Sequence, residues 1–187
     1  YHCSTMPMSL HIANGMFGAV IIEPDNLEPV DKQFVLIQSE LYLDDPGADS
    51  LTADPAGRAA LDKISAFDPD VVMFNGRAYQ YQAHPLSVRT GERVRFWVLD
   101  VGPNEPWAFH IVGTQFDTVW SEGSYSIHHG QSANRLTEGT TGAQVLPLLA
   151  AQGGFVELVV NQPGTYPIVN HVMALAEKGA YGLLEVG

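Results

Sequence analysis

The sequence has few of the residues that disulfide-bonded, nucleic-acid-binding or membrane-spanning proteins need. Its 187 residues include one cysteine, so no disulfide can form within the chain. Only 9 Lys and Arg stand against 21 Asp and Glu, and the formal net charge of -12 argues against binding to nucleic-acid phosphates. No hydrophobic run approaches the ~18 residues of a membrane span. The remaining composition, 45% hydrophobic and 16% charged, is that of a folded globular protein.

Short β-branched and aromatic runs, separated by glycine and proline, favour an all-β fold. A short helix is expected over 56–64, and 170–179 indicates one helical turn or a loop. Strands at a spacing of roughly ten residues are typical of a Greek-key β-sandwich or barrel. They are predicted at 16–23, 33–43, 70–74, 86–88, 92–99, 107–112, 116–120, 143–149, 155–160, 165–169 and 181–186.

The start of the chain carries a group of metal-binding side chains. Cys3 is followed by His11 after seven residues, and by Met16 after four more. A thiolate, an imidazole and a thioether, with one more imidazole from elsewhere, form the ligand set of a blue-copper site. Gly15 and Gly18 would allow the loop to close tightly. The alternative is that the two sulfur residues are core residues and the histidine lies at the surface.

These residues belong to a longer pattern that resembles a known family. YHC followed by HIANGMFGAVIIEP resembles the type 1 copper loop of copper-containing nitrite reductases, two-domain cupredoxins of the multicopper oxidase superfamily. The similarity continues through VDKQFVLIQSELY, VVMFNGR, GPNEPWAFHIVG, FDTVWSEG and PGTYPIVNHVMALAEKGAYGLLEV, and is weak over 44–70 and 124–142. It implies that residues 1–24 are the last strand and type 1 copper loop of an incomplete first domain. Residues 25–187 would then form a second, cupredoxin-like Greek-key domain.

The resemblance also implies a type 2 copper between subunits. His2 matches one of its ligands, and His171 matches a ligand that the neighbouring subunit supplies. A third histidine lies upstream of the matched region. The adjacency of His2 and Cys3 would give an electron a short covalent path from type 1 to type 2 copper. Without the resemblance, His171 is better explained as a capping or surface histidine.

His110 matches a catalytic histidine of the family that ligates no metal. Reduction of nitrite to nitric oxide consumes two protons, and histidine is the residue type that exchanges protons near neutral pH. Its usual companion, an aspartate of the first domain, also lies upstream. Val112 falls where the family often has an isoleucine in the substrate pocket. The alternative for His110 is a structural histidine within a strand.

As a whole, the resemblance implies reduction of nitrite with type 1 and type 2 copper as cofactors. It also implies a homotrimer, a small electron-donor protein (a cupredoxin or cytochrome c) and an extracytoplasmic location, in the periplasm or at the cell surface. The chain opens on Tyr1 instead of Met, so the absence of a leader is uninformative about compartment. His84, His128 and His129 match no functional residue of the family. We expect His128 and His129 to lie in a solvated loop, and metal binding by this pair is the less favoured alternative.

Two other interpretations of the function remain. A laccase-like two-domain multicopper oxidase needs His-X-His pairs for its trinuclear cluster. Cys3 is followed by Ser4, however, and His110 by Ile111, so neither place supplies such a pair. An electron-transfer or structural cupredoxin module would explain the three type 1 ligands but leaves the other three matched histidines without a role.

Overall fold

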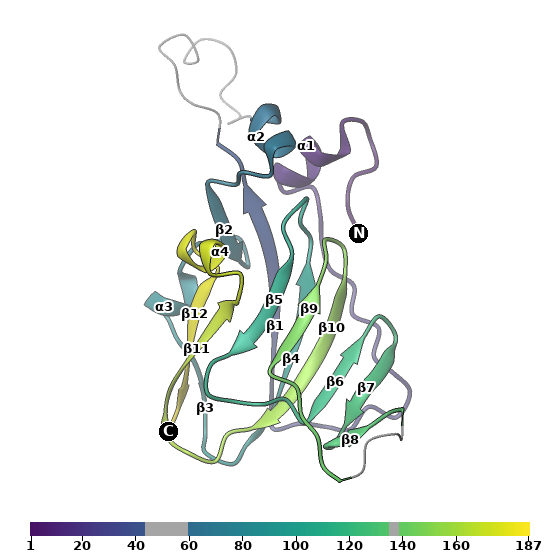
Figure 1. The fold of residues 1–187 in the computed structure, drawn as a ribbon, viewed down its shortest axis with the longest axis vertical. Coiled ribbons are helices and arrows are strands. Elements are labelled where there is room, and N and C mark those ends of the chain that lie inside the picture. The colour runs from purple at the N-terminus through teal and green to yellow at the C-terminus, as the bar shows by residue number, and fades with distance from the viewer. Residues whose placement is uncertain (44–59, 135–138) are drawn as a thin grey trace.

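The computed structural model describes residues 1–43, 60–134 and 139–187, which form two facing sheets (Figure 1). The seven-stranded sheet has the order β2 (Val71–Phe74), β1 (Lys32–Leu41), β4 (Arg93–Asp100), β10 (Gly153–Val159), β6 (Thr118–Ser121), β7 (Ser124–His128) and β8 (Gln131–Ser132). The five-stranded sheet has the order β3 (Leu86–Val88), β12 (Tyr181–Val186), β11 (Gly164–Asn170), β5 (Trp107–Ile111) and β9 (Val145–Leu148). Strand β1 runs parallel to β4, and β12 parallel to β3, while the other pairs are antiparallel. The predicted all-β fold is confirmed.

The helices of the described residues are short and lie at the ends of the sheets. They are α1 (Met8–Ala13), α2 (Leu61–Ala66), α3 (Gln80–Ala83) and α4 (Met173–Glu177). Helices α1 and α2 lie together at one end of the molecule, while α3 and α4 flank the five-stranded sheet (Figure 1). Among the described residues, no helix has the length and hydrophobicity needed to cross a membrane.

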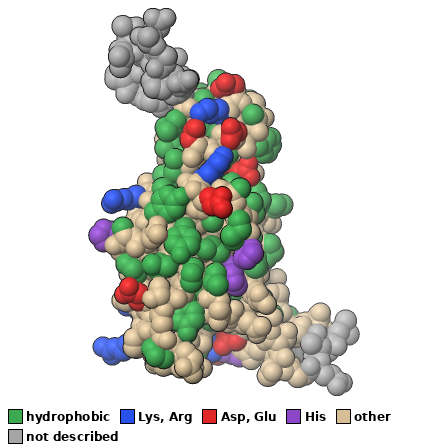
Figure 2. Space-filling view, turned by 60° about the vertical axis from the view of Figure 1, so that its left-hand side comes forward, with side chains coloured by type: hydrophobic (Ala, Val, Ile, Leu, Met, Phe, Trp, Pro, Cys, Tyr) green, Lys and Arg blue, Asp and Glu red, His purple; other side chains and the backbone are tan. Residues whose placement is uncertain are grey.

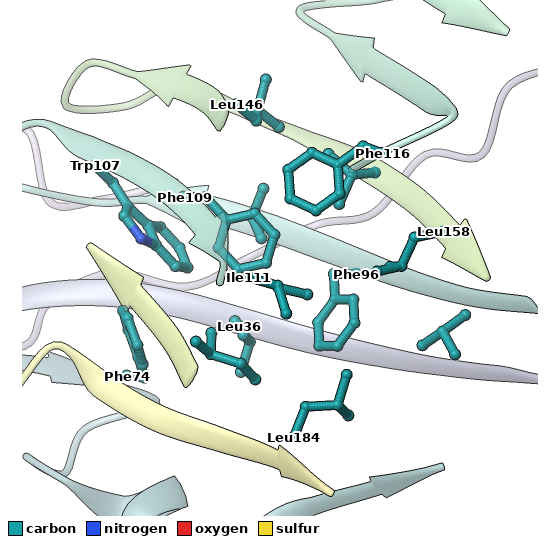
Figure 3. Packing of buried hydrophobic residues seen from close by; sticks show 14 of the residues in the cluster. Leu36, Phe74, Phe96, Trp107, Phe109, Ile111, Phe116, Leu146, Leu158 and Leu184 are labelled. Atoms are coloured by element: carbon teal, nitrogen blue, oxygen red, sulfur yellow. The ribbon is translucent and has the colours of Figure 1, made fainter. Parts of the chain in front are cut away.

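The core between the sheets is mainly aliphatic and has a cluster of aromatic rings within it (Figure 3). The ring of Phe109, on β5, has its centroid 5.8 Å from that of Phe96 on β4, 5.2 Å from Trp107 and 5.7 Å from Phe116. All four side chains are fully buried. Such pairs contribute about 0.5–1.5 kcal/mol each beyond the burial of their area. This cluster fixes β5, the strand that carries His110, against the opposite sheet.

The outer face of the seven-stranded sheet carries a buried ion pair. Arg95 donates from Nε and Nη2 to Oε1 of Glu157 at 2.8 and 2.6 Å. It also donates from Nη2 to the backbone carbonyl of Glu28 at 2.6 Å. The guanidinium lies over the rings of Trp97 and Phe155, at 5.7 and 5.1 Å from their centroids. Arg95 therefore holds the segment that precedes β1 across the outer face of this sheet.

The prediction of a strand at 16–23 is wrong. In this segment only Phe17 forms a bridge, which pairs it with His2. A strand requires a hydrogen-bonding neighbour. Among the described residues, none pairs with the backbone of 19–23, although Ala19, Val20, Ile21 and Ile22 line a groove over the outer sheet face. The segment is hydrophobic but is not buried throughout: the side chains of Val20 and Ile22 remain 71% and 83% exposed.

The other differences concern short elements. Helix α1 interrupts the expected copper loop, and α3 was not predicted. Of the helix expected over 56–64, residues 56–59 lie outside the described residues, and α2 begins at Leu61. Strands β7 and β8 fall in the segment predicted as a loop. Helix α4 resolves the open choice at 170–179 in favour of a helical turn.

A buried carboxyl, Asp100, lies at the end of β4. Its Oδ1 accepts hydrogen bonds from the backbone N–H of Gly102 at 3.1 Å and from Nε2 of Gln38 at 3.4 Å, while Oδ2 has no hydrogen-bond partner among the described residues. Burial raises the pKa of Asp100 from its ordinary 3.8 to about 8, and the nearby charge of Glu40 adds to the shift. Because the folded state holds this proton more tightly than the unfolded state, the contribution of Asp100 to stability falls as pH rises between these two values.

Replacement Asp100→Asn should therefore flatten the pH dependence of the free energy of unfolding between pH 3.8 and about 8. Urea denaturation at several pH values within this window measures the slope. Asp70→Asn is the control: hydrogen bonding to Lys63 lowers the pKa of Asp70, so that carboxyl titrates below the window. Equal slopes for wild type and Asp100→Asn would contradict the assignment.

Candidate metal centre

Backbone hydrogen bonds bring the three predicted type 1 ligands together. The N–H of Cys3 donates to the carbonyl of Met16 at 2.9 Å, and the N–H of Met16 donates to the carbonyl of His11 at 3.0 Å. Tyr1 and Gly18 exchange two further bonds, each of 2.9 Å. A Cβ at Gly18 would meet the side chain of Tyr1, which is exposed at the end of the chain and would have to move aside. The loop thus closes on itself around α1.

The side chains of Cys3 and His11 are in contact. Sγ of Cys3 lies 3.3 Å from Nδ1 of His11. A hydrogen bond from the backbone of Thr5, followed by the bond to His11, lowers the pKa of the Cys3 thiol. This favours the thiolate, the form that ligates metals. Met16 remains 52% exposed. The sulfur and imidazole donors fit a copper ion, since soft sulfur ligands select copper(I) and imidazole suits both oxidation states.

His2 is exposed and held by a local hydrogen bond. Its Nδ1 lies 2.8 Å from the carbonyl of Cys3, and because a carbonyl only accepts, Nδ1 carries the proton. Nε2 is then the nitrogen with a free lone pair. Metal-ligating histidines commonly donate their other ring N–H to a carbonyl in this way. The arrangement fits His2 as a ligand through Nε2.

A second pair of histidines meets at the end of the five-stranded sheet. The rings of His110, on β5, and His171, just after β11, have centroids 5.4 Å apart. Nδ1 of His110 donates to the carbonyl of Gln144 at 2.5 Å, so Nε2 is the ring nitrogen that this bond does not use. His110 is 7% exposed, whereas His171 is exposed. Figure 2 shows histidine and hydrophobic side chains beside one another on the face that carries α4.

The buried side chain of Asn170 shapes the backbone at His171. Its Oδ1 accepts from the N–H of Ala108 at 3.1 Å and of Val172 at 3.0 Å. Its Nδ2 donates to Oε1 of Gln38 at 2.9 Å and to the carbonyl of Pro106 at 2.8 Å. No structural role was predicted for Asn170 from the sequence. The sequence feature that could have indicated it is a polar residue at the end of an apolar strand, immediately before a candidate metal ligand.

The structure does not bring His2 and His171 together. Among the described residues, the ring contact of His171 is with His110 and not with His2. The N-terminus, next to His2, lies on the side of the molecule away from α4, which follows His171 (Figure 1). Val112 is 40% exposed just after β5, where its N–H donates to the carbonyl of Pro167 at 2.8 Å.

The three unassigned histidines lie elsewhere. His84 is at the C-terminus of α3. His128 ends β7, and His129 begins the turn that leads to β8. The loop predicted around His128 and His129 is therefore a hairpin, although both side chains are exposed, as expected for a solvated segment.

The fold is cupredoxin-like and the donor set fits copper, and comparisons with known proteins agree. Curated copper-containing nitrite reductases of Neisseria gonorrhoeae and Neisseria meningitidis are 36% identical over the whole chain. The resemblance seen in the sequence is thereby confirmed. The chain spans 44% and 45% of the length of these two relatives. No family model matches the chain.

Solved structures show the same similarity. A copper-containing nitrite reductase from Thermus scotoductus SA-01 matches with a TM-score of 0.76 and 28% identity, over 96% of this chain and 38% of that one. The copper nitrite reductase from Nitrosomonas europaea matches with a TM-score of 0.76 and 27% identity, over 100% of this chain and 60% of that one. A multicopper oxidase matches with a TM-score of 0.74 and 25% identity, covering 100% of this chain and 55% of that one.

Asn170→Ala should destabilise the protein by about 2–4 kcal/mol, because it leaves buried donors and acceptors without partners. Urea denaturation measures the loss. Asn161→Ala, at an exposed position, is the matched control and should change stability by less than about 0.5 kcal/mol. If both variants unfold at the same urea concentration, the hydrogen bonds of Asn170 do not hold this region.

Proposed function

We propose that this chain is part of a copper-dependent enzyme that reduces nitrite to nitric oxide. The observation that carries the proposal is the contact of Cys3 with His11, in a loop closed onto Met16. It occurs in a chain 36% identical, over its whole length, to proteins named copper-containing nitrite reductases. We further propose that residues 1–24 belong to a first cupredoxin domain and 25–187 to a second.

Two groups of residues would hold the metal. Cys3, His11 and Met16 are the proposed ligands of a type 1 copper, and His2 is a proposed ligand of a type 2 copper with His171 of the partner subunit. Copper ions held by these residues would supply single-electron transfer, with type 1 copper as the proposed entry point and type 2 copper as the proposed acceptor. The adjacency of His2 and Cys3 in the chain supports this order. The separation of His2 from His171 supports assembly of subunits, for which we propose a cyclic homotrimer.

His110 is the proposed proton donor. One electron and two protons convert nitrite into nitric oxide and water, so the site must deliver protons as well as electrons. The bond from Nδ1 to the Gln144 carbonyl orients the ring, and Nε2 is left to take up and release a proton. Val112, partly exposed beyond the end of β5, is the proposed apolar wall of the nitrite pocket.

The cellular setting follows from the same proposal. A small electron-donor protein, either a cupredoxin or a cytochrome c, would reduce the type 1 copper. The location would be extracytoplasmic, in the periplasm or at the cell surface. The laccase-like alternative is disfavoured because the sequence of this chain contains no His-X-His pair.

Two substitutions separate the proposed copper sites in the complete, copper-loaded protein. Cys3→Ala removes the thiolate, so the visible charge-transfer band should disappear while type 2 copper stays bound. His171→Ala should keep that band, lose type 2 copper and abolish nitrite reduction. Absorption and electron paramagnetic resonance spectra, with copper counting, measure both, and His84→Ala is the control. Full copper and full activity in His171→Ala would refute the assignment.

His110→Ala should retain both coppers and the visible band, because His110 is proposed to touch no metal. Turnover of nitrite should fall by about 10²–10⁴-fold, the usual contribution of a general acid, and its pH profile should flatten. His110→Gln, whose amide can still donate to the Gln144 carbonyl, separates this effect from loss of structure. If either variant turns over nitrite normally with normal copper, His110 has no part in the reaction.

A further inference from the structure

The hairpin between β7 and β8, together with Glu28, carries a second cluster of metal-binding side chains, none of which is a proposed copper ligand. Glu28, His128 and His129 each offer one ligand atom, and these atoms all lie within 4.8 Å of one another. We infer that they form a binding site for a divalent transition-metal ion, with Zn²⁺ as the representative ion. This inference does not depend on the proposed nitrite reduction.

The spacing of the donors suits such an ion. Nε2 of His129 lies 3.4 Å from Oε2 of Glu28. Zinc binds nitrogen and carboxylate oxygen at about 2.0–2.2 Å, which puts two ligands of a tetrahedral ion about 3.4 Å apart. His129 and Glu28 already have this separation, and the ligand atom of His128 lies within 4.8 Å of both. The fourth position is left to water or a further ligand.

The turn explains how two consecutive residues face one ion. Successive side chains of a strand point to opposite faces of the sheet. His128 ends β7 opposite Gln131, and the two residues between them have positive φ, 48° at His129 and 74° at Gly130. This left-handed turn ends the alternation, and the rings of His128 and His129 come to lie with centroids 4.4 Å apart.

The backbone of the turn is fixed from several sides. The N–H of His129 donates to Oγ1 of Thr118 at 3.2 Å, and the N–H of Gly130 donates to the carbonyl of Asp117 at 2.7 Å. The N–H of Thr141 donates to the carbonyl of Gly130 at 2.7 Å. A site whose ligands are held before binding loses less conformational entropy when the ion enters. The backbone that carries the two histidines is therefore held in place before an ion binds.

Glu28 is positioned by the buried ion pair of the outer sheet face. Its backbone carbonyl accepts from Arg95, while its side chain is 64% exposed and lies against His129. The segment that contains Glu28 has no regular secondary structure, and this bond, with the two between Asp31 and Arg93, holds it on the outer sheet face. Two imidazoles and one carboxylate suit zinc, copper or nickel, whereas magnesium and calcium prefer oxygen alone.

Equilibrium dialysis of the full chain against Zn²⁺ tests the inference. Wild type should bind one more equivalent of Zn²⁺ than His129→Ala, and Glu28→Gln should weaken that equivalent by about 10–100-fold or more. His84→Ala is the matched control, because it removes an exposed histidine elsewhere and should leave binding unchanged. Taking differences between variants cancels any Zn²⁺ that binds at Cys3 and His11.

The imidazole C–H signals in proton NMR give an independent readout. Signals lost in His128→Ala and His129→Ala should be those that shift when this equivalent of Zn²⁺ is added. Glu28→Gln changes only an exposed side chain, so it tests the site even if a histidine variant fails to fold. Equal stoichiometry and affinity in wild type, His129→Ala and Glu28→Gln would show that Glu28 and His129 form an ion pair only, and would overturn the inference.

Discussion

The four hydrogen bonds of Asn170 are the constraint on which the region around the histidine pair depends. They join the seven-stranded sheet, through Gln38, to the five-stranded sheet, and they fix the backbone on both sides of His171. A buried amide with all its bonds formed permits one geometry, since any shift leaves polar groups without partners. The contact of His171 with His110 therefore rests on a polar residue next to the aromatic core and not on the histidines themselves.

The N-terminal loop is held in a different way. Its closure uses backbone hydrogen bonds between residues of the loop, such as those of Cys3 and Met16. Its link to the rest of the chain is a small cluster in which Leu10 and Ala13 pack with Tyr42 and Ile64. The large core contains no residue of 1–24. Substitutions in the core should thus alter the positions of His110 and His171 more than the position of Cys3.

The sequence predicted strands most accurately where a long apolar segment is also buried in the core. Strands β4, β5 and β12 lie within one or two residues of their predicted limits, because each packs one face into the core. The run at 16–23 has the same composition but no neighbouring strand, and composition alone cannot reveal a missing partner. Strand β7 was missed although SYSIH alternates in polarity and precedes a His-Gly turn. The candidate residues were identified through their motifs, whereas Asn170 and Glu28 depend on contacts between distant segments.

The positions of the candidate ligands limit what one copy of this chain can do alone. The Cys3 side chain contacts His11, while the neighbouring His2 ring bonds back to the Cys3 carbonyl and leaves Nε2 free. His171 contacts His110 on the side of the molecule away from the N-terminus. A metal ion bound by both His2 and His171 therefore requires two copies, each giving a different surface. Heterologous contacts of this kind form a ring when the rotation between copies closes, so the proposed ligand positions and the proposed cyclic assembly are linked hypotheses.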